Sequence, residues 1–123
     1  MPKYHNKKIV VDGNEFDSLK EVRRWQELKL LERAGNITEL ERQVKFVLVP
    51  AQYAPVLDKK KGIWKERCVE RECAYIADFV YKDSQGNRHV EDIKGYKGGG
   101  AYAVFTVKRK LMYYIHNIIV EEI

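Results

Sequence analysis

A carboxylate in the middle of an apolar, strand-like segment constrains this chain more than any other feature. Residues 74–82 read AYIADFVYK, and Asp78 lies at their centre. An acid in such a place is costly to bury unless hydrogen bonds or a cation satisfy it. The turn signal DSQGN at 83–87 and the strand-like RHVEDIK at 88–94 follow directly. The sequence therefore predicts a β-hairpin that carries Asp78 in its first strand.

The turn determines which side chains meet across this hairpin. If the hairpin is symmetric about Gln85, Asp78 lies directly opposite Asp92. Such opposed pairs have Cβ atoms about 5 Å apart. Side-chain alternation puts Lys94 on the same face as Asp92 and Ile93 on the other face. The hairpin thus predicts two facing carboxylates with a lysine beside them, and a one-residue slip in register would separate them.

Alternation also assigns a face to the other residues of the first strand. Ile76, Asp78 and Val80 are expected on one face, with Ala77 and Phe79 on the other. Asp78 is therefore expected to have apolar neighbours on its own face, which adds to the cost of its charge.

Two facing carboxylates repel each other unless a cation lies between them. Mg²⁺ suits such a pair, because it binds through one or two carboxylates and keeps several waters. A lysine beside the ion, here Lys94, can position or deprotonate a water or neutralise charge on a phosphate. Glu21, near the start of the first predicted helix, is a candidate to join the two aspartates.

Each of these residues also has a simpler explanation. Glu21 can complete a capping box with Ser18, and Asp92 and Lys94 can form a surface ion pair. Backbone donors alone can satisfy Asp78. The combination of an acid in an apolar strand, a turn, an acid-x-lysine strand and a basic helix is much rarer than its parts. It favours a catalytic site.

The rest of the chain predicts an α/β fold. In chain order we expect a small hairpin over 8–16, a helix over 18–34, a strand over 44–50, a charged hairpin over 51–73, strands over 74–82 and 88–94, a helix over 102–116 and a final strand over 118–123. No repeat or linker divides these elements, so residues 1–123 are expected to form a single domain.

The core-facing sides of the two helices are predicted from apolar spacing. In the first helix the apolar residues are Val22, Trp25, Leu28 and Leu31, with Leu30 alongside, and Gly35 is placed to end it. In the second helix the residues expected on the core face are Val104, Val107, Leu111 and either Tyr114 or Ile115. Asn117 can end that helix.

Composition excludes several classes of protein. Of the 123 residues, 45% are hydrophobic and 33% are charged, which is typical of a globular chain rather than a disordered one. No uncharged apolar run approaches the ~20 residues of a membrane span. Cys68 and Cys73 fit neither a redox nor a zinc motif and are expected to be free thiols in a reducing cytosol. The net charge of +5 weakly favours a polyanionic partner.

Basic and glycine-rich residues surround the second predicted helix. The candidate DNA contacts are Lys97, Gly98 and Gly99 before it and Lys108, Arg109 and Lys110 within it. Backbone N–H groups at a helix N-terminus favour phosphate, although a flexible loop and a solvated basic face explain the same residues. Gln43 is expected just before the strand at 44–50, where it could reach the acids or belong to a polar turn.

The acids and the lysine carry a family resemblance. Asp78, then Asp92-Ile93-Lys94, preceded by a helix bearing Glu21, resembles the PD-(D/E)xK nuclease superfamily, whose core order of helix, three strands, helix and strand is similar to the order expected here. Ala77 stands where the name of the superfamily has proline. The chain is also similar to a group of small phage-encoded proteins, long labelled a domain of unknown function within that superfamily. The similar segments are 3–8, 11–21, 28–37, 75–83, 90–95 and 107–112.

The resemblance implies a restriction-endonuclease-like core and a Mg²⁺-dependent endodeoxyribonuclease, with Mn²⁺ able to substitute. Asp78, Asp92 and Glu21 would be the metal ligands and Lys94 the catalytic lysine. Glu91 lies on the other face by alternation; its alternatives are to support the ligands from outside the metal site or, if a bulge shifts the strand, to be the ligand itself.

The resemblance also implies branched recombination DNA as the substrate, as for a Holliday-junction resolvase. It further implies a homodimer without a membrane partner in the cytoplasm of a bacterial host, encoded by a phage or prophage. The alternatives are a non-catalytic DNA-binding or replisome accessory module on the same fold and a sequence-specific, restriction-type nuclease.

Overall fold

The computed structural model describes residues 8–95 and 97–123. The resembling segment at 3–8 therefore lies almost entirely outside the described residues. The elements in chain order are β1 (Ile9–Val11), β2 (Asn14–Phe16), α1 (Leu19–Arg33), β3 (Ile37–Val49), β4 (Gln52–Asp58), β5 (Ile63–Glu70), β6 (Cys73–Asp83), β7 (Arg88–Asp92), α2 (Gly99–His116) and β8 (Glu121–Glu122). None of the helices in the described ranges is long and apolar enough to cross a membrane.

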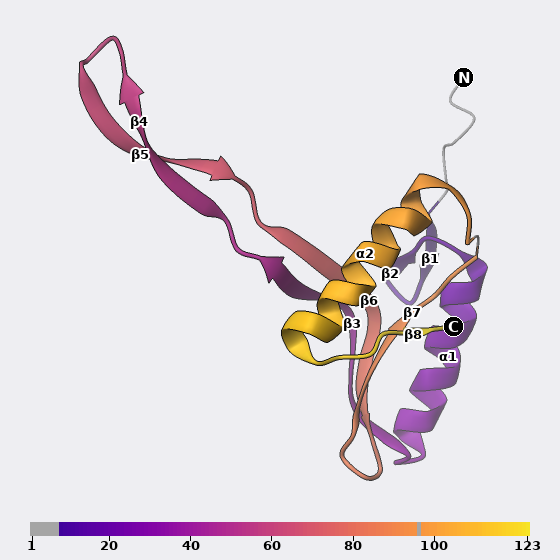
Figure 1. Cartoon of the computed structure of the whole chain (residues 1–123). Coiled ribbons are helices and arrows are strands. Elements are labelled where there is room, and N and C mark those ends of the chain that lie inside the picture. The colour runs from indigo at the N-terminus through magenta and orange to yellow at the C-terminus, as the bar shows by residue number, and fades with distance from the viewer. Residues whose placement is uncertain (1–7, 96) are drawn as a thin grey trace, which may run out of the picture.

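A four-stranded mixed sheet forms the centre of the molecule (Figure 1). Its strand order is β3-β6-β7-β8, with β3, β6 and β7 antiparallel in turn and β8 parallel to β7. The predicted α/β class is confirmed by this sheet and its two helices. The predicted N-terminal hairpin is also present, as β1 paired with β2.

Each helix covers its own face of the sheet, and each face has its own core. We call these the α2-side core, made of Phe46, Leu48, Tyr75, Ala77, Val80, Val90, Phe105, Met112 and Val120, and the α1-side core, made of Phe16, Val22, Leu28, Ile37, Phe79 and Tyr81. The candidate aspartates, Asp78 and Asp92, belong to strands that run between these two cores, and Glu21 belongs to α1.

Helix α1 follows the sequence prediction closely. Ser18 caps its N-terminus by accepting the backbone N–H of Glu21 at 3.2 Å, and Gly35 follows its end in the left-handed conformation, with φ of +80°. Leu30 was expected to join the buried stripe, but it is 64% exposed. It lies two residues from the buried Leu28, which places it on the opposite side of a helix with 3.6 residues per turn.

The predicted core face of α2 is wrong. The buried residues are Phe105 and Met112, whereas Val104 and Val107 are 57% and 58% exposed. Tyr114 and Ile115 are exposed as well, and Leu111 is partly buried against the α2-side core. This helix carries apolar residues on more than one side, so spacing alone could not identify the side that packs. Asn117 ends the helix in the left-handed conformation, as predicted.

Strand β3 begins seven residues before the predicted start at 44, because the polar segment from Ile37 onward pairs with β6 at the edge of the sheet. Gln43 therefore lies inside β3 and not before it, which corrects the prediction. Strand β7 is shorter than expected and ends at Asp92, so Ile93 and Lys94 follow it in irregular backbone.

The strands β3 and β6 both change face at one position. Regular alternation would put Ala77 and Phe79 on one face, yet Ala77 packs in the α2-side core with Val80, while Phe79 packs in the α1-side core. The change occurs at Asp78. Opposite it, between the pairs Arg42↔Phe79 and Val44↔Ala77, Gln43 has a left-handed backbone. The predicted facial assignment fails here because a left-handed residue interrupts the pleat.

Candidate active site

The hairpin register is the predicted one, symmetric about Gln85. Strand β6 pairs with β7 through Phe79↔Glu91 and Val80↔Val90, and Asp78 and Asp92 come directly after the last of these pairs, Phe79↔Glu91. The backbone N–H of Ile93, the residue after Asp92, donates to Oδ2 of Asp78 at 2.8 Å, so the two aspartates lie in the same region. Asp92 is buried and Asp78 is half-buried, so both carboxylates are largely removed from water.

Two hydrogen-bond donors hold the carboxylate of Asp92. The hydroxyl of Tyr75 donates to Oδ2 at 2.6 Å, and Nζ of Lys94 lies 2.8 Å from Oδ1. Burial and the neighbouring Asp92 raise the pKa of Tyr75 well above its usual range, so this phenol stays a donor. Both oxygens of Asp92 are therefore oriented, as a ligand or catalytic carboxylate requires.

Lys94 is fixed by contacts on several sides. Its ammonium lies 3.5 Å from the ring centroid of Phe105 in α2, a cation–π contact. Its backbone carbonyl accepts a hydrogen bond from Nζ of Lys20 at 2.6 Å, and its N–H donates to the carbonyl of Ile123 at 3.1 Å. An aromatic face and a carboxylate thus hold a lysine whose stem is otherwise flexible.

The carboxyl group of Asp78 has a strongly raised pKa. Its pKa is raised to about 7, mainly by burial, and the charges of Asp92 and Glu21 contribute to this increase. The backbone N–H of Ile93, which donates to Oδ2 at 2.8 Å, and the charge of Lys94 act in the opposite direction. The pKa of Asp78 therefore lies near neutral pH, and a bound cation would favour the ionised form of this carboxyl group.

Glu21 reaches the same region from α1. Its side chain is buried at the first turn of the helix, and burial raises its pKa, with the charge of Asp17 adding to the effect. Its backbone N–H donates to the hydroxyl of Ser18 at 3.2 Å, so Ser18 caps the helix without using the Glu21 carboxylate. Its charge contributes to the raised pKa of Asp78, which places Glu21 at the edge of the pair.

The residues present fit a small oxygen-coordinated cation, with one restriction. In the described ranges, 8–95 and 97–123, no three His, Cys, Asp or Glu side chains converge closely enough to enclose an ion. Asp78 and Asp92 form a two-carboxylate pair beside Lys94. Mg²⁺ and Mn²⁺ accept oxygen donors, and Mg²⁺ is satisfied by one or two carboxylates with water in the remaining positions.

Glu91 lies on the opposite side of the sheet. It is fully buried, and its carboxylate accepts hydrogen bonds from Arg24 Nε at 2.8 Å, from Arg24 Nη2 at 2.6 Å and from the hydroxyl of Tyr81. No bulge interrupts the pairing of β7 with β6. Glu91 is therefore committed to an ion pair under α1, and the alternative in which it replaces Asp92 as a ligand does not hold.

Two of the predicted DNA contacts near α2, Lys97 and Arg109, lie close to Glu122 in β8. The carboxylate of Glu122 lies 4.0 Å from Lys97 and 3.2 Å from Arg109, and it accepts a hydrogen bond from the hydroxyl of Tyr102 at 2.8 Å. Arg109 is thus occupied within the fold. Gly98 caps the N-terminus of α2 without a side-chain hydrogen bond, and Gly99 has a φ of +79°. On the helix itself, Lys108 is partly buried and Lys110 is exposed.

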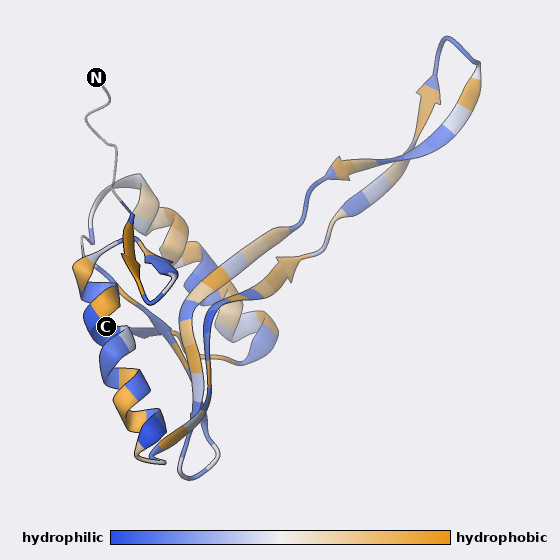
Figure 2. Ribbon diagram, turned by 180° about the vertical axis from the view of Figure 1, so that it is seen from behind, coloured by the Kyte–Doolittle hydropathy of each residue, from blue (hydrophilic) through white to orange (hydrophobic). Residues whose placement is uncertain are grey.

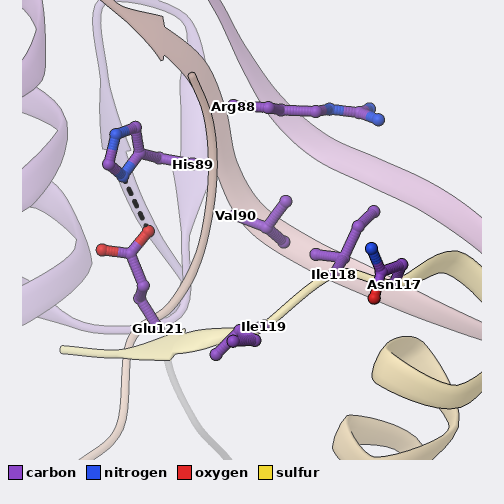
Figure 3. Close-up of a pocket in the computed structure, with 7 residues that line it drawn as sticks. All are labelled: Arg88, His89, Val90, Asn117, Ile118, Ile119 and Glu121. Atoms are coloured by element: carbon purple, nitrogen blue, oxygen red, sulfur yellow. Dashed lines mark hydrogen bonds and ion pairs between the residues drawn. The ribbon is translucent and has the colours of Figure 1, made fainter.

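A pocket between β7 and the α2–β8 connection contains none of the candidate acids (Figure 3). His89 from β7 and Glu121 from β8 point toward each other there, with Nδ1 2.9 Å from Oε2. The other ring nitrogen lies 2.8 Å from Oδ2 of Asp83, and the ring stacks on Tyr81. Asp83 and Glu121 raise the pKa of His89, so this group is a structural ion pair rather than part of the acid site.

Sequence reasoning missed three residues that contact the site. Tyr75 could not be predicted because strict alternation puts it on the face opposite Asp78 and Asp92. The interruption of the pleat at Asp78 removes this restriction, and Tyr75 contacts Asp92. Phe105 was hidden because the wrong face of α2 was expected to pack. Glu122 lies beside Asp92 only through the parallel β7–β8 pairing, which joins distant parts of the chain.

Comparison with known proteins assigns a family to this chain. The model of the family described as "Protein of unknown function (DUF1064)" matches residues 1–120. No curated protein and no solved structure matches the chain. The match covers nearly the whole sequence, and the chain therefore belongs to the DUF1064 family.

Proposed function

We propose that this protein is a metal-dependent endodeoxyribonuclease that hydrolyses phosphodiester bonds. The observation that carries the proposal is the juxtaposition of Asp78 and Asp92 with Lys94, whose Nζ lies 2.8 Å from Oδ1 of Asp92. An ion pair alone would not need a second, half-buried acid with a pKa raised to about 7. Strongly perturbed acids with a defined charge partner are typical of functional sites.

Asp78 and Asp92 would hold the divalent cation, and Glu21 would join them directly or through a water. When bound, the ion would stabilise charge that develops on the phosphate and favour ionisation of a bound water. Tyr75 and Lys94 would keep the carboxylate of Asp92 in one orientation. The ammonium of Lys94 would donate a hydrogen bond to a phosphate oxygen or to the attacking water.

DNA is the proposed substrate class because the chain is basic and the site resembles that of the PD-(D/E)xK superfamily. The net charge of +5 favours a polyanion in general. The resemblance adds branched recombination DNA, such as a four-way junction, and a homodimer that makes paired cuts. It also adds the cytoplasm of a phage-infected bacterium as the setting.

A second candidate is a non-catalytic DNA-binding or accessory module. It is favoured by the lack of a three-acid cluster in the described part of the chain, since a strong metal site often has more ligands. Under this proposal Asp78 and Asp92 would be structural acids.

Cleavage of a labelled DNA panel tests the two candidates. The panel contains single strand, duplex, flap and four-way junction, each with Mg²⁺, Mn²⁺ or EDTA. We expect metal-dependent cutting by the parent protein and by a control variant, Lys29→Ala, and loss of at least about 100-fold in Lys94→Ala. If the parent protein and both variants bind DNA but none of them cuts it, the nuclease proposal is rejected in favour of the accessory module.

A further inference from the structure

The β4–β5 hairpin, here called the arm, extends away from the sheet (Figures 1 and 2). Among the strands of the described residues, β4 pairs only with β5, and every residue of β5 is exposed. An isolated two-stranded ribbon is only marginally stable in water. The arm therefore has the form of an element that is completed by a binding partner.

The cross-strand register gives the arm two different faces. Tyr53 pairs with Cys68 and Leu57 with Trp64, so one face is mainly apolar. The intervening pairs, Ala54↔Arg67 and Val56↔Lys65, give the other face its basic side chains. The two aromatic residues of the apolar face, Trp64 and Tyr53, are 67% and 62% exposed. Figure 2 shows the resulting alternation of hydrophobic and hydrophilic residues along the arm.

Positive charge is concentrated at the outer end of the arm. Residues 58–67 contain five basic and two acidic side chains, a net charge of 5 − 2 = +3, against +5 for the whole chain. The basic residues are Lys59, Lys60, Lys61, Lys65 and Arg67.

The turn that presents the lysines is well built. Oδ1 of Asp58 accepts the N–H groups of Lys60 and Lys61 at 3.0 and 3.3 Å, and the carbonyl of Asp58 accepts the N–H of Gly62 at 2.7 Å. Gly62 takes a left-handed φ of +64°, which favours glycine. The three lysines therefore project from a defined loop.

This combination suits DNA better than a protein surface. Lysine is depleted in protein–protein interfaces, whereas clustered lysines release counterions when they contact phosphates. A two-stranded ribbon fits the major groove, and exposed aromatic rings can stack on unpaired bases. At about 3.3 Å per residue, the seven residues of β4 span about 23 Å. The arm is thus long enough to cross a groove that is about 12 Å wide.

We propose that the arm is a DNA-binding element. Its lysines and Arg67 contact the phosphates of a duplex, and Trp64 lies against the DNA. The inference rests on the proposed function, since it takes DNA as the partner, and it adds a binding element remote from the acids. It also assigns a role to the basic residues of 51–73.

Fluorescence anisotropy in EDTA tests the charge contribution without cleavage. The arm variant is Lys59→Gln/Lys60→Gln/Lys61→Gln, and the matched control is Lys29→Gln/Arg33→Gln/Lys82→Gln on the body. Each lowers the net charge from +5 by three, to +2. We expect the arm variant to bind a labelled duplex at least about tenfold more weakly than the control variant. The slope of log Kd against log salt should fall by up to about 2.7, or 0.9 for each lost phosphate contact.

Tryptophan emission provides a second readout that a general loss of charge would not change. Titration of DNA should quench the emission of the parent protein, because Trp64 is exposed and meets the DNA. In Trp64→Phe, only the half-buried Trp25 remains, and the quenching should disappear. Melting temperature and circular dichroism are measured for both triple variants, and both should be unchanged in the arm variant, since Lys59, Lys60 and Lys61 are not part of either core.

Equal weakening in the two triple variants, or no weakening, would overturn the arm proposal. So would a concentration-dependent dimer, seen by sedimentation, that the arm substitutions dissociate while DNA binding stays intact, because the arm would then bind a second copy. The outcomes remain separable from the nuclease test. If the parent protein binds DNA through the arm but never cuts it, the nuclease proposal is rejected and the arm proposal stands. If the protein cuts DNA and the arm variant binds DNA as well as the parent does, the arm proposal is rejected and the nuclease proposal stands.

Discussion

Gln43 faces Asp78 across the β3–β6 ladder with a left-handed backbone, at a φ of +54°. Both strands change face at this position, so Tyr75 and Val80 both pack under α2 although they are five positions apart, a spacing that regular alternation would put on opposite faces. The change brings the hydroxyl of Tyr75 to Asp92. A strained residue outside the acid cluster therefore determines how one of its carboxylates is held.

Gln43→Gly should stabilise the protein by about 0.5–1 kcal/mol, because glycine adopts a left-handed backbone without the cost that Gln bears. Urea unfolding measures the change in the free energy of unfolding. The control is Glu41→Gly in the same strand, where the backbone is not left-handed. That change should destabilise the protein by a similar amount, and a loss of stability in both variants would show that Gln43 is not strained.

Asp78→Asn should stabilise the metal-free protein at pH 8 and remove metal-dependent cutting. The folded-state pKa of Asp78 is raised to about 7, above its ordinary value of 3.8. The folded protein then binds more protons than the unfolded one between these values, so its stability falls as pH rises through them. The gain from Asn should emerge above pH 4 and be complete above pH 7, reaching up to about 4 kcal/mol.

Thermal melts in EDTA at pH 4, 6 and 8 measure this effect. In separate melts without EDTA, added Mn²⁺ should raise the melting temperature of the parent protein but not of Asp78→Asn, because the cation would bind the folded parent site. A gain that is the same at all three pH values would mean that the charge of Asp78 is not what costs stability.

Tyr75→Phe should reduce cutting by about tenfold and lower stability by about 1–2 kcal/mol, because it leaves Oδ2 of the buried Asp92 without its donor. The exposed Tyr113→Phe serves as control, since it removes a hydroxyl from outside the site. Cutting kinetics with the preferred DNA substrate and urea unfolding are measured for both. Parent-like kinetics in Tyr75→Phe would show that Lys94 alone orients Asp92.

His89→Gln should cost stability at pH 6 and much less at pH 9. Asp83 raises the pKa of His89, and Glu121 adds to the effect. A histidine with a raised folded-state pKa stabilises the fold below its ordinary value of 6.5, and this contribution is lost as pH rises through the raised pKa. Thermal melts across this range compare parent and variant. In the background of Glu121→Gln and Asp83→Asn, the dependence on pH should disappear.

The acid pair was predictable because its geometry depends on local signals. The turn at 83–87 fixes the register, and Asp78 and Asp92 directly follow its last pair, Phe79↔Glu91. Gly35 and Asn117 likewise mark helix ends from sequence alone.

Other contacts depend on tertiary packing. Nothing local distinguishes Phe105 from the equally apolar Val104, and only the sheet beneath α2 decides which one is buried. The left-handed backbone of Gln43 has no sequence signal either, because this conformation usually belongs to Gly, Asn or Asp. Parallel pairing of β8 beside Asp92 joins segments about thirty residues apart, which no hairpin signal marks.

The arm continues the β3–β6 hairpin, whose outermost pair is Val49↔Cys73. Its length can therefore vary at the tip without moving Asp78, Asp92 or Lys94. Adding one residue to each strand next to the turn would lengthen the reach by about 3.3 Å and leave the older pairs in place. A single unpaired insertion would instead exchange the apolar and basic faces beyond that point. The length of the arm and the arrangement of the acids are therefore independent of each other in this fold. If the arm binds DNA and the acids cut it, as proposed above, variants with a longer or shorter arm would change the distance between the bound and the cut positions and leave the acid site unchanged.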